Sequence, residues 1–142
     1  MENVLSSENI KKFITGGNAT FTIKSNVTGV RFTYKVKCAR KYKNDHNKFL
    51  FVSVLTGHNN ESDYTYIGMI KNNAFQLTKK SAFSMNAPSV KAFNWFSQHV
   101  FCNTLPNSCE VYHEGRCGRC GRTLTVPESV ESGFGPECIN KI

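Results

Sequence analysis

Two cysteines separated by two residues stand in the segment HEGRCGRCGRTL, at residues 113–124. Cys117 and Cys120 are each followed by a glycine, which lets the backbone turn tightly and point amide groups at the thiolates. Cys138 supplies a third thiol, and Pro136 places it near the start of a short helix. Structural zinc takes four soft or borderline ligands in a tetrahedron. The pattern therefore predicts a structural zinc site that includes these three cysteines.

Two residues compete for the fourth ligand position. If residues 109–113 are extended, Cys109 and His113 point to the same face, so direction does not choose between them. Only three residues separate His113 from Cys117, and imidazole is an accepted fourth ligand beside three thiolates. We therefore expect His113, with Cys109, or water or another group, as the alternatives.

Other uses of a C-x-x-C pair fit the sequence less well. A redox pair belongs in a βαβ pattern, which is not visible here. No signal peptide and no apolar run of about 18 residues is present, which predicts an intracellular chain with reduced cysteines and no membrane segment. Catalytic zinc needs an open position and a base, whereas four protein ligands close the site. P-loop, H-E-x-x-H and G-x-S-x-G motifs are missing, so we expect no enzyme.

The cysteine segment follows a linker, NTLPNS, and is too small to bury a core of its own. Units below about 40 residues usually need a metal or disulfides. We therefore expect two units, a basic sheet-plus-helix domain at residues 1–104 and a zinc-binding module at residues 105–142.

Alternation of apolar and polar residues predicts most of the first unit. In VRFTYKVKC, at residues 30–38, Phe32, Tyr34 and Val36 face one way and the basic residues face the other, as in a half-buried antiparallel strand. KFLFVSVL is apolar on both faces, which predicts a central strand covered on both sides. We expect an α+β fold, with an antiparallel sheet of about five strands packed on one long helix that starts near Pro88, a short helix within residues 6–15, and a treble-clef or ribbon-like zinc module.

Positive charge is concentrated in the first unit. The chain has a net charge of +8, and residues 1–100 carry 14 basic and 5 acidic side chains. A sheet face rich in lysine and arginine can follow a phosphate backbone. Tyrosines 42, 64 and 66 could stack on bases if they are exposed. Without a nucleic-acid partner, the basic face would simply be solvated and the tyrosines would belong to the core. The arginines around the C-x-x-C pair would then pair with nearby glutamates. The candidate nucleic-acid-binding residues are Arg31, Lys35, Lys37, Arg40, Lys41, Lys43, Arg119 and Arg122, with Arg116 beside them.

Residues 111–138 resemble the C-terminal zinc-binding segment of a family of small, mostly uncharacterised phage and mobile-element proteins. The shared pattern is His, then Cys-Gly-x-Cys-Gly-Arg, Leu-Thr, Pro-x-Ser and Gly-x-Gly-Pro-x-Cys, which this chain matches from His113 to Cys138. The resemblance implies bound zinc with His113 as a ligand. It also implies a viral or plasmid setting, and hence the cytoplasm of a host cell, but it supplies no activity.

Together these features predict a phage or plasmid accessory protein that binds DNA or RNA through its basic sheet face. The alternative is a protein-binding inhibitor of a host defence system, of the anti-defence or anti-CRISPR type, since a basic face can also compete for a protein partner. A zinc-dependent hydrolase is a weaker third hypothesis.

Overall fold

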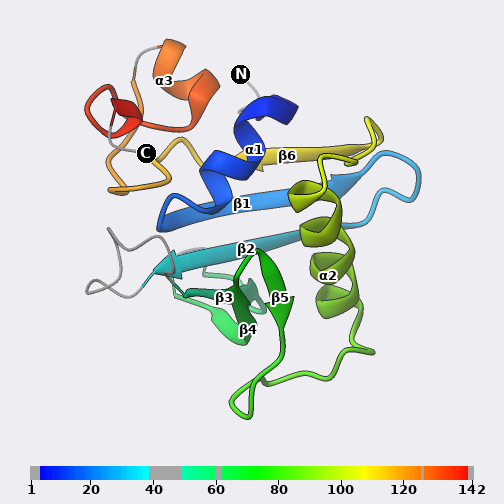
Figure 1. Ribbon diagram of the computed structural model, residues 1–142. Coiled ribbons are helices and arrows are strands. Elements are labelled where there is room, and N and C mark those ends of the chain that lie inside the picture. Colours follow the sequence, from blue (N-terminus) through cyan, green and yellow to red (C-terminus); the bar gives the residue numbers. More distant parts are fainter. Residues whose placement is uncertain (1–3, 39–48, 60–61, 126, 141–142) are drawn as a thin grey trace.

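The computed structural model describes all residues except 1–3, 39–48, 60–61, 126 and 141–142. Six strands form one antiparallel sheet in the order β5-β4-β3-β2-β1-β6 (Figure 1). The strands are β1 (Asn18–Ser25), β2 (Arg31–Cys38), β3 (Leu50–Leu55), β4 (Tyr64–Lys71), β5 (Ala74–Gln76) and β6 (Cys109–His113). The predicted α+β class is confirmed, and β1-β2 and β4-β5 pair as antiparallel neighbours along the chain.

The strand missing from the sequence prediction is β6, which lies in the segment assigned to the zinc-binding module. It pairs with β1, with Val111 opposite Ile23 and His113 opposite Phe21. The sheet therefore has six strands instead of about five. The division at residue 104 stays a prediction, and β6 joins the cysteine segment directly to the sheet.

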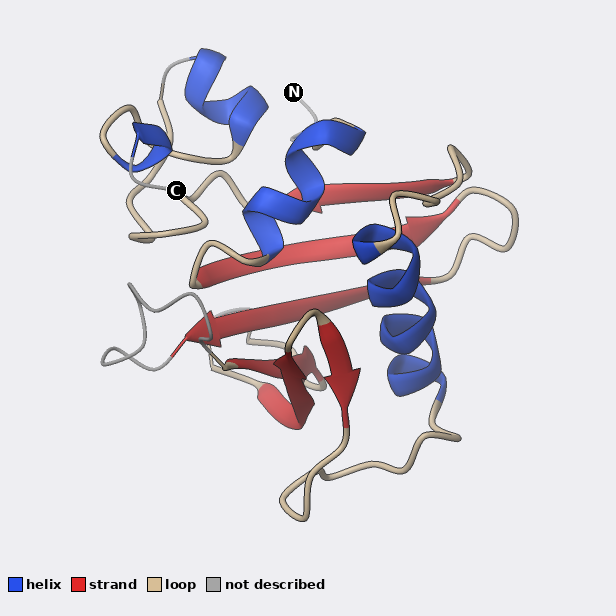
Figure 2. Cartoon of the chain, in the orientation of Figure 1, coloured by secondary structure: helices blue, strands red, loops and turns tan. Residues whose placement is uncertain are grey.

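Helices cover one face of the sheet, as Figures 1 and 2 show. The longer helix, of 14 residues, begins at Pro88, and a helix of 8 residues lies within residues 6–15, as the sequence predicted; both lie on this face. The helices are α1 (Ser7–Ile14), α2 (Pro88–Phe101), the short α3 (Pro127–Ser132) and the 3-10 turn η2 (Cys138–Asn140). Within the described part of the chain, no helix is both long and apolar enough to cross a membrane.

The core lies between the sheet and the two covering helices. On β2, Tyr34 and Val36 are fully buried, while Lys37 is exposed on the other side, so the predicted alternation is confirmed. The Tyr34 hydroxyl donates to the Ser89 carbonyl oxygen on α2 at 2.6 Å, and its ring lies 4.9 Å from that of Phe93. Burial of this aromatic cluster supplies much of the favourable free energy of folding.

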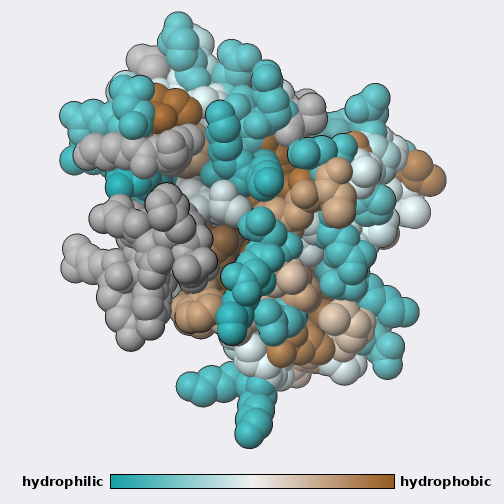
Figure 3. Space-filling model, in the orientation of Figure 1, coloured by the Kyte–Doolittle hydropathy of each residue, from teal (hydrophilic) through white to brown (hydrophobic). Residues whose placement is uncertain are grey.

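We call the other side of the sheet the outer face. It carries the second set of alternating side chains, including Lys35, Lys37, Phe51, Tyr64 and Tyr66. The expectation that β3 is covered on both faces is wrong, because Phe51 is 37% exposed while Val52 is fully buried. On the helix side, hydrophilic residues surround smaller hydrophobic patches (Figure 3).

Candidate metal centre and basic surface

Three thiols meet in the C-terminal segment. The sulfur atoms of Cys117, Cys120 and Cys138 all lie within 4.8 Å of one another. Two thiolates bound to one zinc ion are about 3.8 Å apart when each Zn–S bond is about 2.3 Å, so the group needs only a small contraction. The predicted three-cysteine cluster is therefore present, and these residues could hold a metal ion.

The C-x-x-C turn prepares Cys117 to bind as a thiolate. The Arg119 backbone N–H donates to the Cys117 sulfur at 3.4 Å, and Gly121, with a φ of 80°, lets the turn close. Burial acts to raise the pKa of the Cys117 thiol, but hydrogen bonds from backbone N–H groups, first that of Cys120, outweigh it and bring the pKa to about 7. Metals bind the thiolate, so this turn favours coordination near neutral pH.

His113 does not join the thiols. Its Nδ1 accepts a hydrogen bond from the Gly115 N–H at 2.9 Å, and its Nε2 lies 2.6 Å from the Val130 carbonyl oxygen. Nε2 must then carry the proton, and neither ring nitrogen has a lone pair left for a metal. Burial lowers the pKa of His113, which agrees with a neutral ring. In this structure the predicted fourth ligand instead links β6 to α3.

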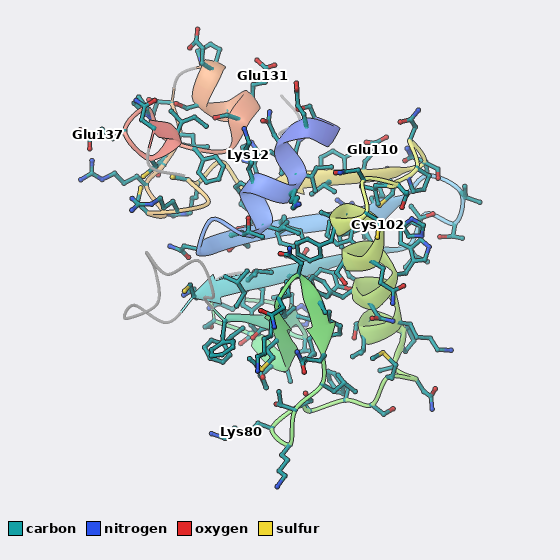
Figure 4. All side chains as sticks on the ribbon, viewed as in Figure 1. Lys12, Lys80, Cys102, Glu110, Glu131 and Glu137 are labelled. Carbon is teal, nitrogen blue, oxygen red and sulfur yellow. The ribbon has the colours of Figure 1, made fainter. Side chains whose placement is uncertain are left out.

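Cys109 also lies away from the thiol group, because it occupies the opposite end of β6 from His113. Its side chain lines a cavity of about 400 Å³ beside Trp95 on α2. Cys102 is at the end of α2, remote from the cysteine segment. Glu137 belongs to the cysteine segment, and its side chain points outward (Figure 4). Among the described residues, the metal-type cluster therefore contains three cysteines and no histidine or carboxylate.

Alkylation should separate Cys109 from the exposed Cys102. Burial, with a contribution from Glu110, raises the pKa of Cys109 from 9.0 to about 11. Since the thiolate is the nucleophile and only about one Cys109 in a thousand is ionised at pH 8, labelling should be slow there, and its rate should rise about tenfold per pH unit up to pH 10. Peptide mass spectrometry after iodoacetamide labelling measures both sites. Equal labelling rates at pH 8 would contradict the assigned environment of Cys109.

The cysteine segment is fixed to the sheet by close backbone contacts. The Asn18 N–H at the start of β1 donates to the Gly118 carbonyl oxygen at 2.8 Å, and the Gly118 N–H donates to Gly133 at 2.8 Å. A Cβ atom at Gly118 would lie only 2.7 Å from the Phe13 ring. Glycine is required there because the turn packs directly on α1.

Arg119 and Arg122 line a cavity of about 350 Å³ next to the thiols. The Arg119 guanidinium approaches the Cys138 sulfur at 3.8 Å, so this arginine faces the thiol group. These two predicted nucleic-acid-binding residues are therefore grouped with the cysteines and not with the basic strand.

A second cavity lies between the basic strand β2 and the C-x-x-C turn. It has a volume of about 360 Å³, and three cations line it, Lys35 and Lys37 from β2 and Arg116 from the C-x-x-C turn, together with Glu114 and polar groups of β1. Arg31 is exposed near the other end of β2, opposite Lys24. The remaining predicted residues, Arg40, Lys41 and Lys43, lie outside the described residues, as does Tyr42.

Sequence reasoning missed the grouping of Arg116 with the lysines of β2, and it missed Phe51 as an outer-face residue. Arg116 comes close to these lysines because β6 joins the sheet beside β1, and the C-x-x-C turn that follows β6 then lies near Lys35. The signal for Phe51 was present in the sequence, since side chains alternate along a strand and Phe51 must therefore point to the other face from Leu50 and Val52.

The fold and site define an α+β protein whose antiparallel sheet carries a C-terminal cysteine cluster suited to a metal ion. Residues 110–142 match the model of a family of unknown function (DUF6011). The match covers 33 of the 142 residues and includes the three clustered cysteines, in agreement with the expected resemblance of this segment to uncharacterised proteins. Comparisons with curated proteins and with solved structures find no match.

Proposed function

We propose that the protein binds nucleic acid through the outer face of its sheet and that a structural zinc ion holds the C-terminal segment against that sheet. Its setting is that of a phage or plasmid accessory protein in the cytoplasm of a host cell. The proposal includes no catalysis. Zinc is preferred over other metals because thiolates are soft ligands and the C-x-x-C turn suits a tetrahedral site of treble-clef or ribbon type.

One observation carries the proposal for nucleic acid. Lys35, Lys37 and Arg116 come from two distant parts of the chain and line one cavity together with hydroxyl and amide groups. Three cations against the single carboxylate of Glu114 leave a local positive charge, which suits a phosphate group. Arg31 extends the positive charge along β2, whereas the charge of Lys24 is offset by Glu110, which lies opposite it on β6.

The binding experiment uses labelled single-stranded DNA, duplex DNA and RNA of equal length at two salt concentrations. We expect binding that weakens with salt, because each neutralised phosphate releases counterions. Replacing Lys35, Lys37 and Arg116 by alanine should weaken binding and reduce the salt slope by about one per phosphate contact.

The matched control replaces three exposed lysines that lie away from the cavity, Lys79, Lys80 and Lys91, by alanine. This control variant removes the same net charge but leaves the cavity intact, so it should bind nearly as the original protein does. Absence of salt-sensitive binding to every probe would refute the proposed function. An equal loss in both triple variants would show that net charge, and not the cavity, drives binding.

A protein-binding inhibitor of host defence is the second candidate. The observation that favours it is an apolar cavity of about 400 Å³ between β2 and α2, beside Trp95 and Val30, which are 42% and 50% exposed. Exposed aromatic and branched side chains are typical of protein interfaces. A stoichiometric host partner that survives nuclease treatment and is lost on Trp95→Ala would favour this function.

A further inference from the structure

We infer that the nucleic acid bound on the outer face is single-stranded and that its bases stack on Phe51 and Tyr66. The inference rests on the proposed function, because it needs the cations of the outer face to hold the backbone. It adds the class of ligand and the two rings that recognise it.

Aromatic rings gather on the outer face of β3 and β4. The Phe51 and Tyr66 rings are neighbours with centroids 6.3 Å apart, and Tyr64 follows on the same side of β4. The Tyr66 hydroxyl hydrogen-bonds the Thr78 hydroxyl at 3.1 Å, which fixes the orientation of its ring. The two ring planes are inclined by 56°, and an exposed phenylalanine beside an anchored tyrosine provides apolar ring surface without the entropy cost of ordering flexible side chains.

Cations alternate with these rings. The Lys35 ammonium lies 4.4 Å from the centre of the Tyr64 ring, and that of Lys71 lies 5.4 Å from the Phe49 ring. Lys37 pairs with Phe51 across β2 and β3. Because Lys35 lies over the Tyr64 ring, we assign Tyr64 to positioning that cation and assign base stacking to Phe51 and Tyr66.

The geometry points to a single strand. In a duplex the base faces are stacked inside, and only phosphates and groove edges reach a protein surface. Rings on the face of a sheet could not contact the stacked base faces of a duplex, and a phosphate backbone laid over them would gain little from their apolar area. Splayed bases of a single strand present faces to the rings while their phosphates reach Lys37 and the cavity of Lys35 and Arg116.

The test measures fluorescence anisotropy with oligo(dT), oligo(U) and a duplex of equal length. Phe51→Leu and Tyr66→Leu should each weaken single-strand binding by about tenfold, with the salt slope unchanged. Duplex binding should be weaker than single-strand binding and insensitive to either change. Tyr66→Phe keeps the ring and should retain single-strand binding. The matched control is Trp95→Leu, which removes an exposed aromatic ring from α2.

The two single-strand probes distinguish the source of the ligand. Tighter binding of oligo(dT) or of oligo(U) assigns DNA or RNA, and both results support the inference. Duplex binding as tight as single-strand binding, or leucine variants that bind like the original protein, would overturn the inference and leave the proposed function standing. Salt-sensitive binding to none of the three probes would overturn both. Thermal melting of each variant confirms that the fold is retained.

Discussion

Chelating the proposed zinc ion should unfold the segment from β6 to η2 while the remainder of the sheet persists. Structural zinc contributes about 10 kcal/mol or more of binding free energy in small zinc-dependent units, and this segment packs few apolar side chains of its own. Hydrogen exchange with and without a strong chelator measures the effect. We expect loss of protection across the segment from β6 to η2, with β2 and β3 still protected. Native mass spectrometry should find one zinc ion per chain before chelation.

Two exposed cysteines provide the control. Cys120 belongs to the thiol group and Cys102 lies at the end of α2, so Cys120→Ser should lose the metal and Cys102→Ser should keep it. Since both ring nitrogens of His113 are engaged by backbone groups, His113→Gln should also keep one zinc ion per chain. Metal loss from His113→Gln would restore His113 as the fourth ligand. Purified, reduced protein without stoichiometric metal would refute the metal centre.

Phe13→Ala should be the most destabilising single substitution in the core that joins α1 to the cysteine segment. The Phe13 ring is 1% exposed and contacts rings from three places, Phe21 of β1, His113 of β6 and Phe134 after α3, at centroid distances of 6.4, 5.7 and 6.0 Å. Truncation leaves a cavity that the surrounding backbone cannot close. We expect a loss of about 3–5 kcal/mol in the free energy of unfolding, measured by urea denaturation.

The matched substitution is Phe83→Ala, because Phe83 is 37% exposed in the loop before α2. It should cost less than about 1 kcal/mol. Hydrogen exchange adds a second readout, since Phe13→Ala should loosen both α1 and the turn around Gly118. Similar losses from the two substitutions would show that Phe13 does not couple these parts.

Local patterns predicted the parts of the fold that depend on nearby residues. Strand β2 was recognised because one face must be buried, and a period of two records that burial in the sequence. Strand β6 was missed because it has only five residues and its partner lies about 90 positions earlier, with Tyr112 opposite Thr22. Register between such distant segments is a tertiary property that spacing does not encode.

The candidate site divides in the same way. Cys117, Cys120 and Cys138 could be predicted because a tight turn and a helix start bring sulfur atoms together locally. The spacing of His113 also suggested a ligand, but its imidazole is held by Gly115 and by Val130, whose carbonyl position depends on how α3 folds back. A donor atom's availability depends on its other hydrogen-bond partners, and these were not visible in the motif.

The position of β6 would connect loss of the proposed zinc ion with self-association of the protein. This strand covers the edge of β1, and its own far edge is covered by the N-terminal segment, through the Leu5 N–H to Val111 carbonyl hydrogen bond at 2.8 Å. If the ion leaves and β6 detaches, the backbone donors and acceptors of β1 become a template on which a second copy can add a strand. Metal-depleted chains should therefore be prone to edge-to-edge aggregation, because the cysteine segment no longer covers the edge strand β1.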